Sequence, residues 1–274
     1  MTDIEIRRID AESNFFLLDA TKEEFQGQLE NFLVCKLTEF MDEDGAENIC
    51  DYSHYICSSS LDIVCSSNWI TAESLCHSIY KRTGIKTSFS NANQCATWGF
   101  LARYHLLHKP NIRNIFLSIV DANPLGMRFW NNNPSWGKSN FCVTNIHLRL
   151  LDDTQAACLT IGKCNPEVML YDYAGLLRER ARNFTGRTIV PPFFDEKMRK
   201  GLSRVLKDFN HLPDQFEKFG HLYGSDPWVS LSLAIKDGMK GNKFVLSSIA
   251  SEGYYCFLSA QVPINIKTKE LILS

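Results

Sequence analysis

The chain lacks a long apolar run, an excess of charge of either sign and an apolar leader, and each absence narrows what it can be. No stretch approaches the roughly 20 consecutive apolar residues that a membrane span needs. The amino-terminal segment MTDIEIRRIDAESN lacks the apolar core of a signal peptide, so we expect a cytoplasmic protein. A formal net charge of −2 predicts neither nucleic-acid binding nor membrane-surface binding by electrostatics.

Cysteine is abundant, with ten residues, but no two of them have C-x-x-C spacing. A structural zinc site therefore has little support, and disulfides are not expected without an export signal. His105 and His108 form an i, i+3 pair that can share a metal, although two histidines near an exposed helix end are the simpler interpretation. We expect no metal and no permanently bound cofactor.

The hydrophobic pattern predicts an α/β layered fold with a largely parallel sheet. Amphipathic helices are expected over residues 21–43 and 71–83, and buried strands over 52–58, 111–122 and 141–151. Both halves of the chain run helix, polar loop, helix, buried strand, strand. We therefore predict two related halves, residues 1–152 and 153–274, packed into one body.

One stretch is typical of a nucleophile. Residues 84–107, GIKTSFSNANQCATWGFLARYHLL, predict a short strand, a polar elbow and an amphipathic helix, with Cys95 at the first helical turn. Unpaired backbone N–H groups and the helix dipole stabilise a thiolate at that position. Free cysteine is also among the most buried residue types, so Cys95 as a small core residue is the alternative.

Three segments resemble the thiolase superfamily, and within it the 3-oxoacyl-acyl-carrier-protein synthase III (ketosynthase III-like) branch. SNANQCATWGFLARYHLL resembles the family's nucleophile segment, and LPDQFEKFGHLYGSDPWVSLSLAI resembles the segment that carries its second catalytic amide. GNKFVLSSIASEGYYCFLSAQV resembles the closing hairpin with its glycine-rich turn. The resemblance implies a thiolase-like layered αβαβα fold of two related halves, trimmed relative to the family.

The resemblance also implies a chemistry, in which a cysteine takes an acyl group from an acyl-CoA or acyl-carrier-protein thioester. Cys95 matches the nucleophile, and its own amide would be one oxyanion-hole donor. Gly253 aligns with the turn that supplies the second donor, and His221 occupies the slot of the family's asparagine. Phe194 stands where the family's histidine is expected. His221 is predicted to form a dyad with Cys95; the alternative is a loop histidine bonded to a backbone carbonyl or to Asp226.

Two functions follow, and an unrelated α/β protein with Cys95 in its core is the third possibility. The first is a ketosynthase III-like acyltransferase or condensing enzyme of specialised (fatty-acid, polyketide or quinolone-type) metabolism. The second is a catalytically degenerate partner subunit, like a chain-length factor, of a heterodimeric ketosynthase. Retained Cys95 favours the first, and the missing histidine favours the second.

The resemblance implies further contacts. It predicts a homodimer, or a heterodimer with a ketosynthase paralogue, that pairs through the strand after the nucleophile helix, residues 115–120. Trp98 and Trp130 are predicted to contact substrate, and their alternative is a place in the core or as loop anchors.

Overall fold

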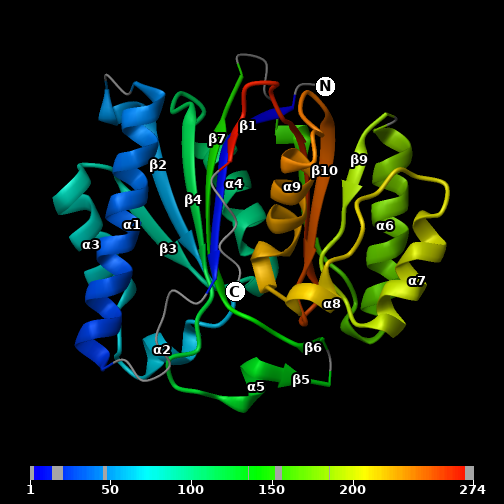
Figure 1. Cartoon of the computed structure of the whole chain (residues 1–274), viewed down its shortest axis with the longest axis horizontal. Coiled ribbons are helices and arrows are strands. Elements are labelled where there is room, and N and C mark those ends of the chain that lie inside the picture. Colours follow the sequence, from blue (N-terminus) through cyan, green and yellow to red (C-terminus); the bar gives the residue numbers. More distant parts are fainter. Residues whose placement is uncertain are drawn as a thin grey trace.

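The computed structural model describes residues 3–13, 21–45, 48–134, 136–151, 156–184 and 186–268. Helices and sheets alternate in five layers (Figure 1). Helices α1 (Lys22–Asp44) and α3 (Ala72–Thr83) cover one outer side, and α6 (Met169–Asn183) and α7 (Glu196–Leu206) cover the other. Helices α4 (Thr97–His108) and α9 (Asp226–Lys236) lie between the two sheet regions. The α/β layered arrangement predicted from the sequence is confirmed.

The α-helices begin and end close to the residues that periodicity predicts. Helix α1 starts at a capping box, in which the Thr21 side chain accepts from Glu24 N–H and the Glu24 carboxylate accepts from Thr21 N–H. Helix α3 ends at Gly84, whose φ of +74° is the left-handed conformation that glycine adopts without strain. The helices are α1 (Lys22–Asp44), α2 (Asp62–Ser66), α3 (Ala72–Thr83), α4 (Thr97–His108), α5 (Arg128–Asn131), α6 (Met169–Asn183), α7 (Glu196–Leu206), α8 (Phe216–Phe219) and α9 (Asp226–Lys236). Short 3-10 turns are η1 (Ile49–Asp51), η2 (Gln94–Ala96), η3 (Ala156–Cys158), η4 (Pro166–Val168) and η5 (Tyr223–Ser225).

The main sheet has the strand order β3-β2-β4-β7-β1-β11-β10-β9, with β8 paired to β11 and β12 paired to β1. Its strands are β1 (Ile4–Ser13), β2 (Tyr52–Cys57), β3 (Thr87–Ser90), β4 (Asn114–Val120), β7 (Cys142–Arg149), β8 (Leu159–Lys163), β9 (Thr188–Val190), β10 (Lys243–Ile249), β11 (Tyr254–Gln261) and β12 (Lys267–Thr268). Two-residue strands β5 (Asn132–Asn133) and β6 (Gly137–Lys138) pair separately.

The sheet is mixed, which corrects the expectation of a largely parallel one. Strand β2 runs parallel to β3 and β4, whereas β7 is antiparallel to both β4 and β1, and β10 is antiparallel to β11. A strand that is buried on both faces has the same continuous apolar pattern whether its neighbours run parallel or antiparallel to it, so the sequence pattern did not distinguish the two arrangements. Strand β1 joins the two regions, with Ile4 opposite Ala260 of β11. The predicted boundary between the halves, 152/153, lies outside the described residues.

Strand β4 is internal, and the expected pairing of residues 115–120 with a second subunit is therefore wrong. Its backbone is hydrogen-bonded to β2 on one side and to β7 on the other, which leaves no open edge. The long apolar run reflects burial on both faces, with helices packed against each. Strand β3, at the end of the strand order, is the edge on this side of the sheet.

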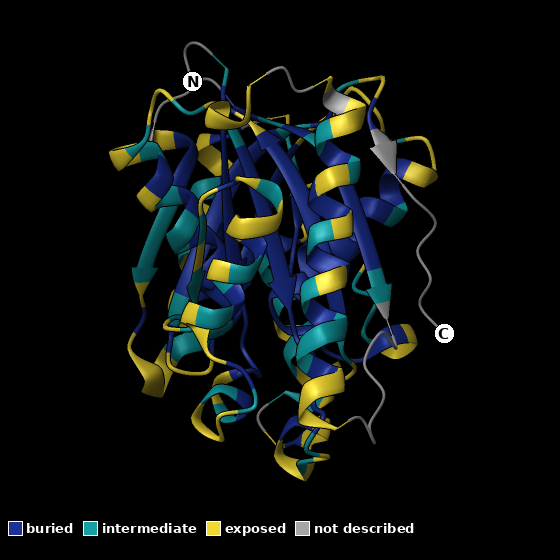
Figure 2. Ribbon diagram, turned by 90° about the vertical axis from the view of Figure 1, so that its left-hand side faces the viewer, coloured by how far each residue is buried: buried dark blue, intermediate teal, exposed yellow. Residues whose placement is uncertain are grey.

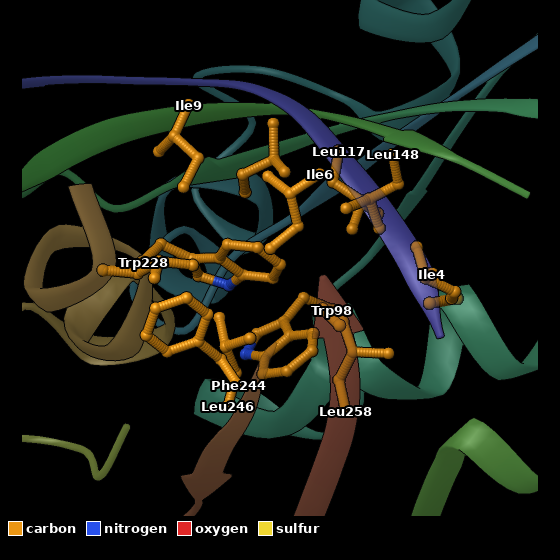
Figure 3. Packing of buried hydrophobic residues seen from close by; sticks show 14 of the residues in the cluster. Ile4, Ile6, Ile9, Trp98, Leu117, Leu148, Trp228, Phe244, Leu246 and Leu258 are labelled. Atoms are coloured by element: carbon orange, nitrogen blue, oxygen red, sulfur yellow. The ribbon is translucent and has the colours of Figure 1, made fainter. Parts of the chain in front are cut away.

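The core is concentrated in the strands and the central helices, and the outer faces of the surface helices are exposed (Figure 2). Trp98 of α4 meets Trp228 of α9 edge to face, with ring centroids 5.1 Å apart, between apolar side chains of both sheet regions (Figure 3). Within the described ranges, no helix is long and apolar enough to cross a membrane.

The two central helices start at equivalent turns. Turn η2 precedes α4 and turn η5 precedes α9, and each begins with a non-glycine residue of positive φ, Gln94 at +47° and Tyr223 at +56°. The turns touch: a Cβ added to Gly224 would lie 3.3 Å from the carbonyl oxygen of Cys95. The residues at both helix starts are therefore brought to one place, beside the ends of β2 and β4.

Candidate active site

Cys95 lies in the middle of η2, where the chain passes from β3 into α4. Its side chain is buried and lines a cavity. The left-handed conformation of Gln94 is unusual for a residue with a side chain and is of the kind found at functional sites. The elbow is held by Asn93 N–H, which donates to Thr97 Oγ1 at 3.1 Å, and by Ser251 Oγ, which donates to Gln94 Oε1 at 2.8 Å.

His221 lies between α8 and η5, and its imidazole Nε2 is 3.7 Å from Cys95 Sγ. The backbone of His221 is held on both sides: its backbone N–H donates to Lys138 O at 2.8 Å, and its backbone carbonyl accepts from Asn140 N–H at 3.0 Å. Gly220 makes this contact possible, because a Cβ there would lie 2.8 Å from the same Lys138 oxygen. The structure thus brings together the two residues that the sequence proposed as a dyad.

Asp226 adds a third member. It is the first residue of α9 and is fully buried, and its Oδ2 lies 2.7 Å from His221 Nδ1. Backbone N–H groups of Phe193 and Leu222 donate to its Oδ2 and Oδ1 at 2.9 and 2.6 Å. The sequence offered Asp226 as the partner of a non-catalytic histidine, but in the structure the same imidazole contacts both the carboxylate and the thiol.

Electrostatics set the proton arrangement of this chain of groups. Burial lowers the pKa of His221, but the charge of Asp226 and its hydrogen bond outweigh burial, so the His221 pKa lies well above its usual range. Burial raises the pKa of the Asp226 carboxyl, while His221 and the two backbone donors favour its charged form. Nε2 is the imidazole nitrogen that faces the sulfur, and the raised pKa of His221 makes this nitrogen a strong base for the thiol proton.

The cavity beside Cys95 has a volume of about 290 Å³ and a largely aromatic wall. Phe129, Trp130, Trp136 and Tyr223 line it; Trp130 and Trp136 stack, and the other ring contacts among them are edge to face. A second cavity of about 510 Å³, between α6 and α7, shares three lining residues with the first: Leu170, Phe194 and Met198. These three side chains therefore form part of the wall of both cavities.

Phe194, which stands in the slot of the expected histidine, lines the first cavity. His221 is the one imidazole among the residues that line it. In the described part of the chain, no group of three or more His, Cys, Asp or Glu side chains is arranged to hold a metal ion. Among the described lining residues, His221 therefore supplies the imidazole, and Ser59, Gln94 and Ser251 add polar groups to a mainly apolar wall.

Two residues that the sequence analysis assigned to the site, Gly253 and Trp98, have structural roles instead. Gly253 N–H donates to Ala250 O at 2.9 Å, and a Cβ at Gly253 would lie 2.6 Å from Cys164 O, so this glycine serves the hairpin turn and its amide is already used. Trp98 is fully buried among the apolar side chains of the central layer (Figure 3). Its Nε1–H donates to Ser248 Oγ at 3.0 Å, and it does not line the cavity. We therefore assign Trp98 to the core. Trp130 does line the cavity.

Ser59 was missed by the sequence analysis. It follows β2, is buried, and its Oγ lies 3.6 Å from Cys95 Sγ. The signal was a run of three serines directly after a buried strand, a position at which side chains of a parallel sheet gather at the carboxyl edge.

Comparison with solved structures shows the class of fold: it is similar to that of 3-oxoacyl-acyl-carrier-protein synthase III enzymes and related condensing enzymes and acyltransferases. The 3-oxoacyl-(acyl carrier protein) synthase III, FabH, of Pseudomonas aeruginosa PAO1 matches with a TM-score of 0.62 and 11% identity, over 96% of this chain and 99% of that one. ChlB3, described as an acyltransferase, matches with a TM-score of 0.63 and 13% identity over 97% and 99% of the two chains. AbyA1, a tetronic acid condensing enzyme, matches with a TM-score of 0.62 and 11% identity over 93% and 98%. The sequence matches no protein-family model and no curated protein.

Proposed function

We propose that this protein is a ketosynthase III-like acyltransferase of specialised metabolism that carries an acyl group on Cys95 and passes it to a hydroxyl or amine acceptor. The observation that carries the proposal is the continuous contact from Cys95 Sγ through the His221 imidazole to the Asp226 carboxylate. Thiol, imidazole and carboxylate in this order are the groups that activate a cysteine nucleophile.

Acylation uses the groups as follows. His221 Nε2 takes the proton of the Cys95 thiol, and the sulfur attacks the carbonyl carbon of the donor thioester. The donor's sulfur leaves and takes the proton back from Nε2, so an acyl-thioester on Cys95 and a free donor thiol are formed. The positive charge on the imidazole in the intermediate is stabilised by Asp226, 2.7 Å from Nδ1. The Cys95 amide, in the place of the family's donor, is proposed to bind the oxyanion.

The second half-reaction reverses these roles. An acceptor hydroxyl or amine gives its proton to Nε2 and attacks the acyl carbon, and the Cys95 sulfur leaves as thiolate or thiol. Decarboxylative condensation asks for more, because the family's enzymes hold an enolate with two separate polar side chains. Phe194, on the cavity wall in one of those two positions, has no hydrogen to donate. This favours simple acyl transfer over carbon–carbon bond formation.

The donor is proposed to be an acyl-CoA or an acyl-carrier protein. Exposed basic residues follow one face of α7 and its end at three- and four-residue spacing: Lys197, Lys200, Arg204 and Lys207. Lys197 also lines the second cavity, which shares Leu170, Phe194 and Met198 with the wall of the first. A phosphopantetheine arm in this cavity would place its phosphate near the basic face, and the apolar first cavity suits the acyl group.

The test is intact-protein mass spectrometry after incubation with a panel of acyl-CoA and acyl-carrier thioesters. The wild type is expected to gain the mass of one acyl group, and Cys95→Ala is expected to gain none. Lys197→Glu with Arg204→Glu is expected to slow loading from a carrier protein but not from a short acyl thioester that lacks the phosphate. Lys81→Glu with Arg82→Glu, at exposed positions in the last turn of α3, reverses the same number of charges and is the matched control. Absence of an adduct from every donor would refute the proposal.

The second candidate function is the non-catalytic partner subunit of a ketosynthase. Two features favour this second function: Phe194 stands where the family has a histidine, and the backbone N–H of Gly253 already donates to Ala250 O. Each of them removes a group that the condensing reaction needs. Under either function we propose a dimer, with itself or with a paralogue, that pairs through edge strand β3 in place of the internal β4. Acylation of a paralogue that depends on this chain, without an adduct on Cys95, would support the partner function.

A further inference from the structure

A second polar side chain, besides His221, contacts the sulfur of Cys95. Ser59 Oγ is 3.6 Å from Cys95 Sγ, with the hydroxyl as donor. The serine is 5% exposed and lines the same cavity as the thiol. Within the described residues, this is the hydrogen bond that the Ser59 hydroxyl makes.

The segment that carries Ser59 is fixed by a buried carboxylate. Asp121 directly follows β4, and its Oδ1 accepts from the backbone N–H groups of Ser59 and Ser60 at 2.7 and 2.9 Å. The same oxygen accepts from the hydroxyls of Ser58 and Ser60 at 3.2 and 3.1 Å. Asp121 thereby clamps the end of β2 to the end of β4. It uses the backbone of Ser59 and not its hydroxyl, so an alanine at this position would satisfy the clamp equally well.

We propose that Ser59 is a catalytic residue, whose hydroxyl donates to Cys95 Sγ and stabilises the thiolate formed when His221 Nε2 takes the thiol proton. The proton passes from sulfur to nitrogen, and the Ser59 O–H remains intact as a donor to the negative sulfur. A hydrogen bond to a charged acceptor is about twice as strong as one between neutral groups, so its effect appears when the thiol ionises. Asp121 acts through Ser59 and is a positioning residue.

The other titratable groups near the sulfur do not replace this donor. His221 accepts the proton and becomes the cation of the pair. Tyr223 and Cys256 also interact with Cys95, but burial raises the pKa of each far above neutrality, so both stay uncharged. Asp121 is fully buried behind Ser59 and its four donors hold it there. Ser59 and His221 are thus the two side chains whose hydrogen bonds to the sulfur respond to its charge.

The experiment measures the reactivity of Cys95 without any acyl substrate. Wild type and variants are alkylated with iodoacetamide at pH 7, and the modification of Cys95 is followed by peptide mass spectrometry, because Cys35 and Cys50 are exposed thiols as well. Ser59→Ala is expected to slow alkylation of Cys95 about tenfold, the effect of one hydrogen bond to a charged acceptor. Ser59→Thr keeps the hydroxyl and is expected to restore most of the rate. Ser232→Ala, which removes a buried hydroxyl of α9 elsewhere, is the control for loss of a buried serine.

Two results would overturn the inference: Ser59→Ala that alkylates at the wild-type rate with an unchanged Tm, or an equal loss in Ser232→Ala. The inference rests on Cys95 being the nucleophile of the proposed function but not on the thioester donor. Alkylation that depends on Ser59 without any acyl adduct would refute the proposed function and keep the inference. If Ser59→Ala forms the acyl adduct and is alkylated as fast as the wild type, the proposed function is supported and the inference about Ser59 is refuted.

Discussion

Asp226→Asn is the sharpest test of the proposed chemistry, because it removes one charge and keeps the size of the side chain. The carboxylate accepts from three N–H groups: Phe193 N, Leu222 N and His221 Nδ1. The contact to His221 is charge-assisted and short, and such a bond contributes about 1.5–3 kcal/mol. At about 1.4 kcal/mol for each factor of ten, its loss in the transition state slows acylation of Cys95 by about 10- to 100-fold.

The same substitution also affects stability, and this effect needs its own control. An asparagine amide NH₂ cannot accept, so at least one N–H group loses its partner, namely Leu222 N–H when the amide oxygen takes the place of Oδ2, at a cost of about 1–3 kcal/mol. Asp214→Asn matches that loss, because Asp214 accepts from Phe194 N–H and Phe216 N–H at 2.9 and 2.6 Å and does not contact the imidazole. We expect both variants to lower Tm and only Asp226→Asn to slow acylation.

The assay is single-turnover acylation at pH 7, quenched at intervals and measured as intact mass, with Tm recorded for each protein. Alkylation of Cys95 by iodoacetamide gives a parallel readout that needs no thioester. A folded Asp226→Asn that acylates within about threefold of the wild type would refute the assigned role of the carboxylate, since the charge-assisted bond predicts at least tenfold. An equal loss of rate in Asp214→Asn would attribute the effect to local unfolding instead.

Further predictions concern pH, the cavity wall and the sheet edge. Because its pKa is raised in the folded protein, protonated His221 contributes stability that is fully present below about pH 6.5 and is lost as the pH rises through the folded-state pKa. The Tm difference between wild type and His221→Gln should therefore shrink as the pH rises through that pKa. A Tm difference that stays constant with pH would contradict this prediction. Burial raises the pKa of Asp121 from 3.8 to about 6. Between about pH 3.5 and 7, the free energy of unfolding of the wild type, measured with urea, should therefore fall by about 3 kcal/mol relative to that of Asp121→Asn. A difference between the two proteins that does not change with pH would contradict the raised pKa. Trp130→Ala should change the acyl-group preference of Cys95 loading, whereas Trp98→Ala should cost about 3–5 kcal/mol of stability without changing that preference. Ser88→Asp puts a charge on β3 and should yield a monomer by light scattering where the wild type is dimeric; a dimer in both would exclude pairing through β3.

The sequence by itself determined the elements and the nucleophile segment, because these depend on neighbours along the chain. The capping box of Thr21 and Glu24, the glycine stop at Gly84 and the strand–elbow–helix around Cys95 are all local patterns, and the structure has each of them. The order along the chain of the three segments that resemble the thiolase superfamily was also enough to indicate the fold class. None of this required knowing which strands pair.

Apart from His221, which the family resemblance placed beside Cys95, tertiary structure alone decided what surrounds the sulfur, because those contacts join residues far apart in the chain. Ser59 and His221 reach Cys95 from 36 and 126 residues away. Burial was predictable for Trp98, but which buried side chains face a cavity depends on the packing of both central helices. Likewise, β4 is internal because β7 returns antiparallel beside it, and an apolar run is the same in an edge strand and a central one. Hydrophobic patterning specifies that a side chain is buried, and only the assembled layers specify what it is buried against.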